Sequence, residues 1–165
     1  PVGEMLKHGI TVSLGVDGAA SNNGQDMLEL MKTTALLQKV HTLSPTAITA
    51  EKVLEMATID GARAIGMERE IGSLEAGKKA DFVVFNPYRS AKAVPVHNPV
   101  STLVYSSTMQ NIESVAVDGT FLMENGVVTV IPDEEAVLRE GQRIAERLAQ
   151  RAGIRNRGAG HRWTT

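Results

Sequence analysis

The sequence predicts an α/β fold, and three observations support this prediction. β-Favouring residues fill Thr11–Val16 and run into Asp17 and Gly18, a pattern typical of a strand that ends in a sharp turn. A polar loop and a run with helical apolar spacing follow, so strand, loop and helix make half of a β/α repeat. Further along, Asp118-Gly119 and Asn125-Gly126 are hairpin signals between β-favouring runs. We therefore expect a piece of parallel α/β structure followed by a small antiparallel sheet.

Composition and charge narrow the class of protein. The chain has 165 residues, of which 42% are hydrophobic and 22% charged, values typical of a soluble globular protein with a sizeable core. Its net charge of −2 argues against a nucleic-acid partner, and without cysteine it has no disulfides or thiolate metal sites. No apolar run is long enough to cross a bilayer and no leader pattern is present, so we expect a cytoplasmic protein without a membrane partner. Because the chain starts at Pro1 and enters a helix almost at once, we expect it to be a fragment.

The first part of the chain is expected to contain one strand and several helices. In chain order these are the end of a helix at 2–8, a short buried strand at 10–16, a loop at 18–25, and helices near 27–40, 50–58 and 61–65. Gly9 and Gly66 are placed to end two of these helices, and Asp26 and Thr49 are expected to cap the two longest. The expected core residues are apolar side chains at helical spacing: Leu28, Met31, Ala35, Leu36, Val53, Leu54 and Met56.

The second part is expected to be an antiparallel sheet followed by one long helix. Its elements are a glycine-flanked turn at 72–77, strands at 81–85, 113–117, 121–123 and 127–131, an irregular crossing at 87–99, and a helix that Asp133 caps and that extends to about Ala152. One side of this helix is apolar, with Val137, Gly141, Ile144, Leu148 and Ala152. An i,i+4 stripe of arginines also follows it: Arg139, Arg143, Arg147, Arg151 and Arg155. We interpret the stripe as a solvated face, with docking on an acidic surface of the protein or of a neighbouring subunit as the alternative.

Asp17 is the candidate residue for chemistry. An acid at the carboxyl end of a strand in a parallel barrel lies where reactive groups collect. Such a carboxylate can hold a metal ion and accept a proton from metal-bound water. From spacing alone, the simpler interpretation is an Asp in a tight turn beside a glycine. On either interpretation, Gly15 and Gly18 are expected to shape the turn that presents Asp17.

Other polar and aromatic residues allow structural or functional interpretations. Ser21, Asn22 and Asn23 are expected to prepare the start of the next helix, and the alternative is contact with a substrate or a bond to Asp17. The remaining candidates are interpreted as structural: Gly72 and Gly77 as turn positions, Tyr105 as a core residue with a bonded hydroxyl, His97 as a loop residue, and His41, His161 and Trp163 as residues without a role.

Four segments of the chain resemble the amidohydrolase superfamily. They are residues 15–23 with the helix after them, 56–66, 71–85 and 98–106, and they occur in the family's order. The resemblance covers about residues 1–131. Within the superfamily the sequence is most similar to the S-adenosylhomocysteine/methylthioadenosine deaminases, with the triazine aminohydrolases and chlorohydrolases beside them.

The resemblance implies a fold and a domain organisation. The family fold is a metal-dependent (β/α)8 barrel with a small β-sandwich made from both chain ends. Residues 1–67 are then the last strand and helices of the barrel, 68–131 the C-terminal half of the sandwich, and 132–165 a C-terminal helix with a flexible tail. The family also implies one divalent metal ion, zinc or iron.

The resemblance also assigns a role to Asp17. It matches the family's aspartate after the eighth strand, which implies a metal ligand and catalytic proton acceptor, with Ser21 and Asn22 as substrate-binding candidates. The family's His-x-His pair, later His and proton-shuttling Glu have no counterpart in this chain. We therefore expect the isolated chain to be inactive and to hold no metal.

The function implied for the intact protein is hydrolysis of a non-peptide C–N bond. The expected substrate is a small amino-heterocycle, such as an amino-purine nucleoside or a triazine, and the expected assembly is a homo-oligomer. Two alternatives stay open: a triazine chlorohydrolase, and a non-catalytic structural or oligomerisation module.

Overall fold

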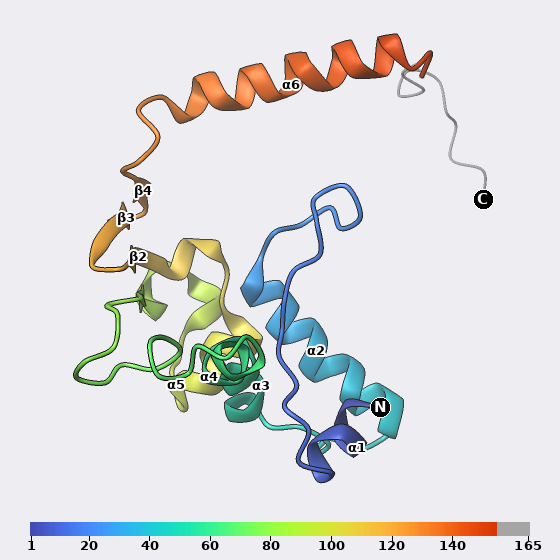
Figure 1. Ribbon diagram of the computed structural model, residues 1–165, viewed down its shortest axis with the longest axis vertical. Helices are drawn as coiled ribbons and strands as arrows, with labels where there is room; N and C mark the ends of the chain where they lie inside the picture. Colours follow the sequence, from blue (N-terminus) through green and yellow to red (C-terminus); the bar gives the residue numbers. More distant parts are fainter. Residues whose placement is uncertain (155–165) are drawn as a thin grey trace. The chain divides into compact units, whose positions relative to one another are not determined.

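The computed structural model describes residues 1–154 and divides into two units, Pro1–Val127 and the chain from Val128 onward (Figure 1). Helices of the first unit are α1 (Val2–Lys7), α2 (Met27–Thr42), α3 (Ala50–Ala57), α4 (Ile59–Ala64) and α5 (Pro99–Ser101), with short 3-10 turns η1 (Pro87–Arg89), η2 (Ala91–Ala93) and η4 (Met109–Asn111) and a π-helical turn η3 (Thr102–Ser106). The strands are β1 (Phe82–Phe85), β2 (Ile112–Val117), β3 (Thr120–Glu124) and β4 (Val127–Val128). The second unit contains α6 (Glu134–Arg151).

Helix boundaries follow the predicted capping residues. The side chains of Asp26, Thr49 and Asp133 each accept a hydrogen bond from a backbone amide in the first turn of α2, α3 and α6. Gly9 and Gly66 follow the ends of α1 and α4 with φ of 71° and 72°, in the left-handed region that glycine adopts without strain. The predicted caps and helix ends are therefore confirmed.

The core of the first unit is helical. α2, α3 and η3 contribute most of its buried apolar side chains, which are Met31, Ala35, Ile48, Ala50, Val53, Met56 and Val104. Leu28 and Leu54 are partly buried against this cluster. Leu36 was expected in the core and is 44% exposed, so that prediction is wrong. It lies on a side of α2 that also exposes Leu37 and Val40, and the described residues do not cover that side.

The predicted buried strand at 10–16 is also wrong in this structure. The segment joins no sheet within residues 1–154, and Ile10 is 53% exposed. Val12 and Leu14 pack against the helical core, and the Leu14 amide donates to the Met56 carbonyl at 2.9 Å. The alternate residues, including Ser13, face away and are exposed. A parallel strand is stabilised by neighbours on both sides, and the described residues supply none.

The sheet has the order β1-β2-β3-β4, and β1–β2 and β2–β3 pair antiparallel. Asp118-Gly119 and Asn125-Gly126 connect consecutive strands, and all four residues have φ between 51° and 83°. Both predicted hairpins are therefore confirmed, because positive φ at two adjacent turn residues is the conformation that Asp-Gly and Asn-Gly favour. The last strand ends at Val128 instead of the expected position 131.

The turn at 72–77 lies directly against α4. Gly72 has φ of 89°, and a Cβ on it would lie 2.7 Å from the Ala62 Cβ and 3.0 Å from the Ile59 Cα. This close approach requires glycine, which confirms the structural interpretation of the turn. The assignments of 1–67 to a barrel, 68–131 to a half-sandwich and 132–165 to a helix with a tail remain predictions.

The second unit is described by itself. None of the residues of α6 is buried, although Val137, Ile144 and Leu148 are apolar. Arg139, Arg143, Arg147 and Arg151 of the predicted stripe lie on this helix, whereas Arg155, His161 and Trp163 lie outside the described residues. Up to residue 154, no helix has both the length and the apolar character that a membrane span requires.

Candidate functional site

The extended segment 10–16 leads into the loop before α2 (Figure 1). Asp17 lies at the junction between this segment and the loop. Its side chain is exposed, and its Oδ1 accepts a hydrogen bond of 2.7 Å from the Gly18 amide. The second carboxylate oxygen has no hydrogen-bond donor within residues 1–154. Asp17 therefore offers a solvent-accessible carboxylate that can take a ligand or a proton.

The loop after Asp17 folds back on itself just before the start of α2. Gln25 Nε2 donates to the Asp17 carbonyl at 2.6 Å, across eight residues of sequence. The Ser21 and Asn22 amides both donate to the Gly18 carbonyl, at 2.9 and 2.8 Å. These bonds place Asp17 beside the N-terminal end of α2. The loop is therefore held by hydrogen bonds between its own residues.

The two glycines beside Asp17 are not required by the described structure. A Cβ on Gly15 or Gly18 would meet no atom within 4 Å, and neither residue has a left-handed φ. The expectation that they shape the turn is therefore not explained by contacts in this part of the chain. The described residues therefore give no steric reason for glycine at these two positions.

The predicted substrate-binding residues are exposed on the same loop. Asn22 Nδ2 donates to the Gly24 carbonyl at 2.7 Å, so this side chain stabilises the loop. The Ser21 hydroxyl and the Asn23 side chain are also exposed. The structure thus brings these residues to the same end of α2 as Asp17, and their role toward a substrate stays a prediction.

A complete metal centre is not assembled by residues 1–154, in which no group of three His, Asp or Glu side chains lies together. His8 follows α1, His41 lies near the end of α2, and His97 precedes α5. Catalytic zinc sites use about three protein ligands, and Asp17 can supply one. The residues described here therefore do not by themselves fit a metal ion, although Asp17 fits as one of several ligands.

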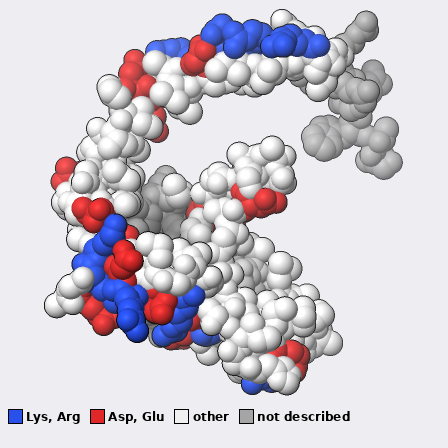
Figure 2. Space-filling view, viewed as in Figure 1, with Lys and Arg blue, Asp and Glu red and all other residues white. Residues whose placement is uncertain are grey.

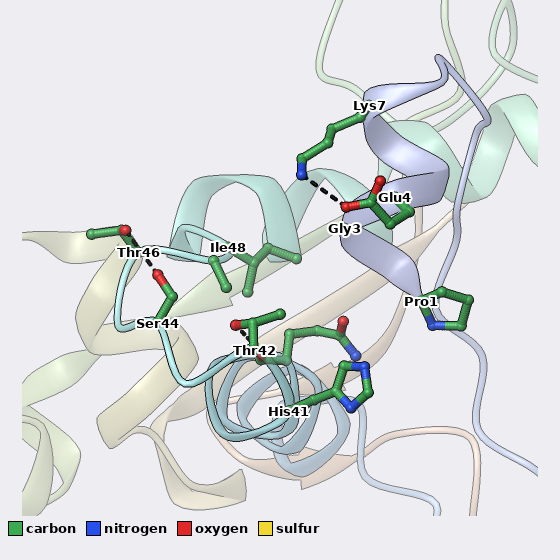
Figure 3. Close-up of a pocket in the computed structure, with 11 residues that line it drawn as sticks. Pro1, Gly3, Glu4, Lys7, His41, Thr42, Ser44, Thr46 and Ile48 are labelled. Carbon is green, nitrogen blue, oxygen red and sulfur yellow. Dashed lines mark hydrogen bonds and ion pairs between the residues drawn. The ribbon is translucent and has the colours of Figure 1, made fainter.

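A surface cavity of about 430 Å³ lies at the opposite end of α2 (Figure 3). It is lined by α1, the last turns of α2 and the loop that follows: Pro1, Gly3, Glu4, Lys7, Gln38, His41, Thr42, Ser44, Thr46, Ala47 and Ile48. The lining mixes polar and apolar surface, and Lys7 and Glu4 bond to each other at 2.8 Å, which lowers the pKa of Glu4. None of the predicted site residues lines this cavity, so it is separate from the Asp17 loop.

An ionic cluster around the buried Asp60, which was not predicted from the sequence, joins α3 to α4. The side chain of Asp60 is 5% exposed and bonds to Lys52 Nζ at 2.6 Å and to Arg63 Nη1 at 2.8 Å. Burial alone would raise the pKa of Asp60, but the hydrogen bonds from the two cations outweigh it and hold this pKa below its ordinary value. The i,i+3 spacing of Asp60 and Arg63 is the signal that could have indicated half of this cluster.

Tyr105 has the bonded hydroxyl that was expected from the sequence. Lys39 Nζ donates to its oxygen at 2.6 Å and lies 4.6 Å from the ring centroid. The ring is partly buried against the helical core. This contact joins η3 to α2, and it does not involve the Asp17 loop.

Comparison with known proteins connects this geometry to a family. A 5-methylthioadenosine/S-adenosylhomocysteine deaminase of Desulforudis audaxviator is 47% identical over 150 residues, which cover 91% of this chain and 34% of the relative. An S-triazine hydrolase of Gordonia rubripertincta is 38% identical over 157 residues, with coverage of 93% and 33%. A solved adenosine deaminase from Xanthomonas campestris with bound zinc superposes with a TM-score of 0.85 at 29% identity, with coverage of 91% and 34%.

These matches agree with the resemblance predicted from the four sequence segments. The chain spans about a third of the length of the curated relatives it matches. The profile of the Amidohydrolase family matches residues 1–122, which is most of the chain. This chain therefore belongs to the amidohydrolase family.

Proposed function

We propose that this chain is part of a hydrolase that deaminates an amino-purine nucleoside. The observation that carries the proposal is the 47% identity to a 5-methylthioadenosine/S-adenosylhomocysteine deaminase over 91% of the chain. The high structural similarity to a zinc-containing adenosine deaminase supports the same substrate class. Replacement of the exocyclic amine by water releases ammonia and leaves an oxo group on the ring carbon.

Asp17 is the chemical residue in this proposal. Its carboxylate is exposed, and the Gly18 and Gln25 bonds hold it at the end of an extended segment. Asp17 would contribute one oxygen ligand to a divalent metal and would accept a proton from the attacking water. The metal, when bound, polarises that water. The other ligands would come from polypeptide outside residues 1–165.

The exposed outer side of segment 10–16 supports an incomplete barrel. Residues of this segment face the helical core and solvent in alternation, which leaves one face and one edge of the segment for contact with neighbouring strands. We assign residues 1–67 to the end of a (β/α)8 barrel, 68–131 to half of a β-sandwich and 132–165 to the C-terminal helix and tail. Ser21 and Asn22 would then lie at the rim where substrates bind.

The test is an assay of the longer protein that contains this chain, purified with a divalent metal. Ammonia release is measured from adenosine, S-adenosylhomocysteine and methylthioadenosine, and from amino-triazines. We expect turnover of the nucleosides and a loss of at least about a hundredfold in Asp17→Asn. Asp118→Asn is the matched control, because Asp118 is an exposed acid in a hairpin turn where asparagine also fits. Failure to release ammonia from any adenine nucleoside would contradict the proposal.

A triazine hydrolase is the second candidate, and the 38% identity to an S-triazine hydrolase favours it. A second measurement on the same protein separates the two, since a chlorohydrolase releases chloride from a chlorotriazine and a deaminase releases ammonia from an amino-purine nucleoside. Asp17 would have the same role in both reactions.

A further inference from the structure

The apolar side of α6 is uncovered within its own unit. Val137, Ile144 and Leu148 are 55%, 36% and 53% exposed, and no residue of α6 is buried. Helices in proteins derive most of their stability from packing an apolar face. A helix of 18 residues with such a face therefore needs a packing partner.

The spacing on this side is that of a two-helix seam. Positions 134, 137, 141, 144, 148 and 151 follow one another at intervals of three and four residues, which is the heptad pattern of coiled coils. Apolar or small residues occupy the four inner positions, and Glu134 and Arg151 occupy the two ends. A Cβ on Gly141 would meet no atom within 4 Å, so the inner seam has open space for a side chain from outside.

Charge is distributed unevenly along α6. Acids predominate in its first half and arginines in its second half, as Figure 2 shows. Arg139 bonds to Glu135 at 2.9 Å and Arg143 to Glu140 at 2.5 Å, both within the helix. Glu134 and Arg151, at the ends of the seam, have no ion-pair partner within residues 1–154. At the two ends of the seam the unpaired charges are therefore opposite in sign.

We propose that α6 pairs in antiparallel orientation with α6 of a second copy of this chain. If the two-fold axis passes between positions 142 and 143, residues equally distant from that point face each other. Val137 then meets Leu148 of the second copy, and Gly141 leaves room for its Ile144.

The same register also pairs the charges at the two ends of the seam. Glu134 of each copy meets Arg151 of the other, because both lie equally far from the axis. A parallel pair would instead place Glu134 against Glu134 and Arg151 against Arg151, which repel. One arrangement thus satisfies both the apolar seam and the end charges.

The test uses the longer protein that contains this chain and two charge reversals, Glu134→Arg and Arg151→Glu. Each variant places like charges at both ends of the seam, so we expect its dimer dissociation constant to rise about tenfold at low salt. Sedimentation equilibrium measures this constant. Arg139→Glu is the matched control: it makes the same charge change on the side of α6 away from the seam and should associate like the wild type.

Mixing the two single variants in equal amounts gives the sharper measurement. A chain with arginine at both ends then faces a chain with glutamate at both ends, so we expect a heterodimer of wild-type affinity. Circular dichroism follows helix content, since a variant that only weakens its own helix is not restored by mixing.

Three results would overturn the proposal. They are a wild-type chain that is monomeric at all concentrations, association that neither reversal weakens, and single variants that do not restore each other. The first result would mean that another part of the protein packs on the apolar side of α6. The second would assign association to a different surface.

Discussion

Neutralising Asp60 should destabilise the chain, and the structure sets the size of the effect. The Asp60→Asn change keeps the shape of the side chain but removes the negative charge with which Lys52 and Arg63 both pair. Hydrogen bonds to a charged group contribute about 1.5–3 kcal/mol each, and Asp60 makes two, at 2.6 and 2.8 Å. The partners are 32% and 51% exposed, so water solvates them when the carboxylate is lost. We therefore expect a loss of about 2 kcal/mol in the free energy of unfolding.

Urea unfolding at neutral pH, followed by circular dichroism, measures this loss as a lower midpoint with an unchanged slope. Glu4→Gln is the control, because it removes an ion pair in which both side chains are mostly exposed, and it should leave the midpoint unchanged. Equal midpoints for Asp60→Asn and the wild type would refute the argument that the cluster joins α3 to α4.

The same cluster predicts a pH dependence with a definite sign. The folded-state pKa of Asp60 is lower than the unfolded one, so its contribution is present above the unfolded value of about 3.9. This contribution is lost as the pH falls through the folded-state pKa. The stability difference between wild type and Asp60→Asn should therefore be constant from pH 5 to 7 and shrink below about pH 4. A difference that grows on acidification would contradict the assigned direction.

Two further substitutions test the packing of the first unit. Gly72→Ala should lower the free energy of unfolding by about 2–4 kcal/mol, because the added Cβ would lie 2.7 Å from the Ala62 Cβ at a φ of 89°. Gly77 has a similar φ but open space around it, so Gly77→Ala should lower this free energy by only about 1 kcal/mol. Thermal or urea unfolding measures both, and equal losses would show that the contact with Ala62 is not tight. Met56→Ala should cost about 2–5 kcal/mol because Met56 is fully buried, whereas Leu37→Ala, 58% exposed, should change little; similar effects at the two positions would contradict the helical core.

Local signals in the sequence predicted most of the secondary structure. Asp26, Thr49 and Asp133 cap their helices through bonds to amides within one turn, so their effect needs no distant partner. The hairpins at Asp118-Gly119 and Asn125-Gly126 likewise depend on the φ preferences of two adjacent residues.

The charged residues likewise include one that was predicted from the sequence and a cluster that was not. Asp17 was identified from its place after a β-favouring run and from the family resemblance, and the structure adds the bonds from Gly18 and Gln25. The ion-pair cluster of Asp60 was missed, since Lys52 lies eight residues away on a different helix. The sequence shows charges, but only the crossing of α3 and α4 shows which of them meet.

By itself the sequence determined the helix ends, the hairpins, the apolar spacing of α6 and membership of the amidohydrolase family, because each depends on neighbours close in the chain or on a continuous pattern. Tertiary structure alone decided whether an apolar side chain is covered. Met31 and Leu36 lie on the same helix, yet one is 4% and the other 44% exposed. Segment 10–16 has the composition of a strand and joins no sheet within residues 1–154, because strand pairing is a contact between separate segments and a local preference cannot supply its partner.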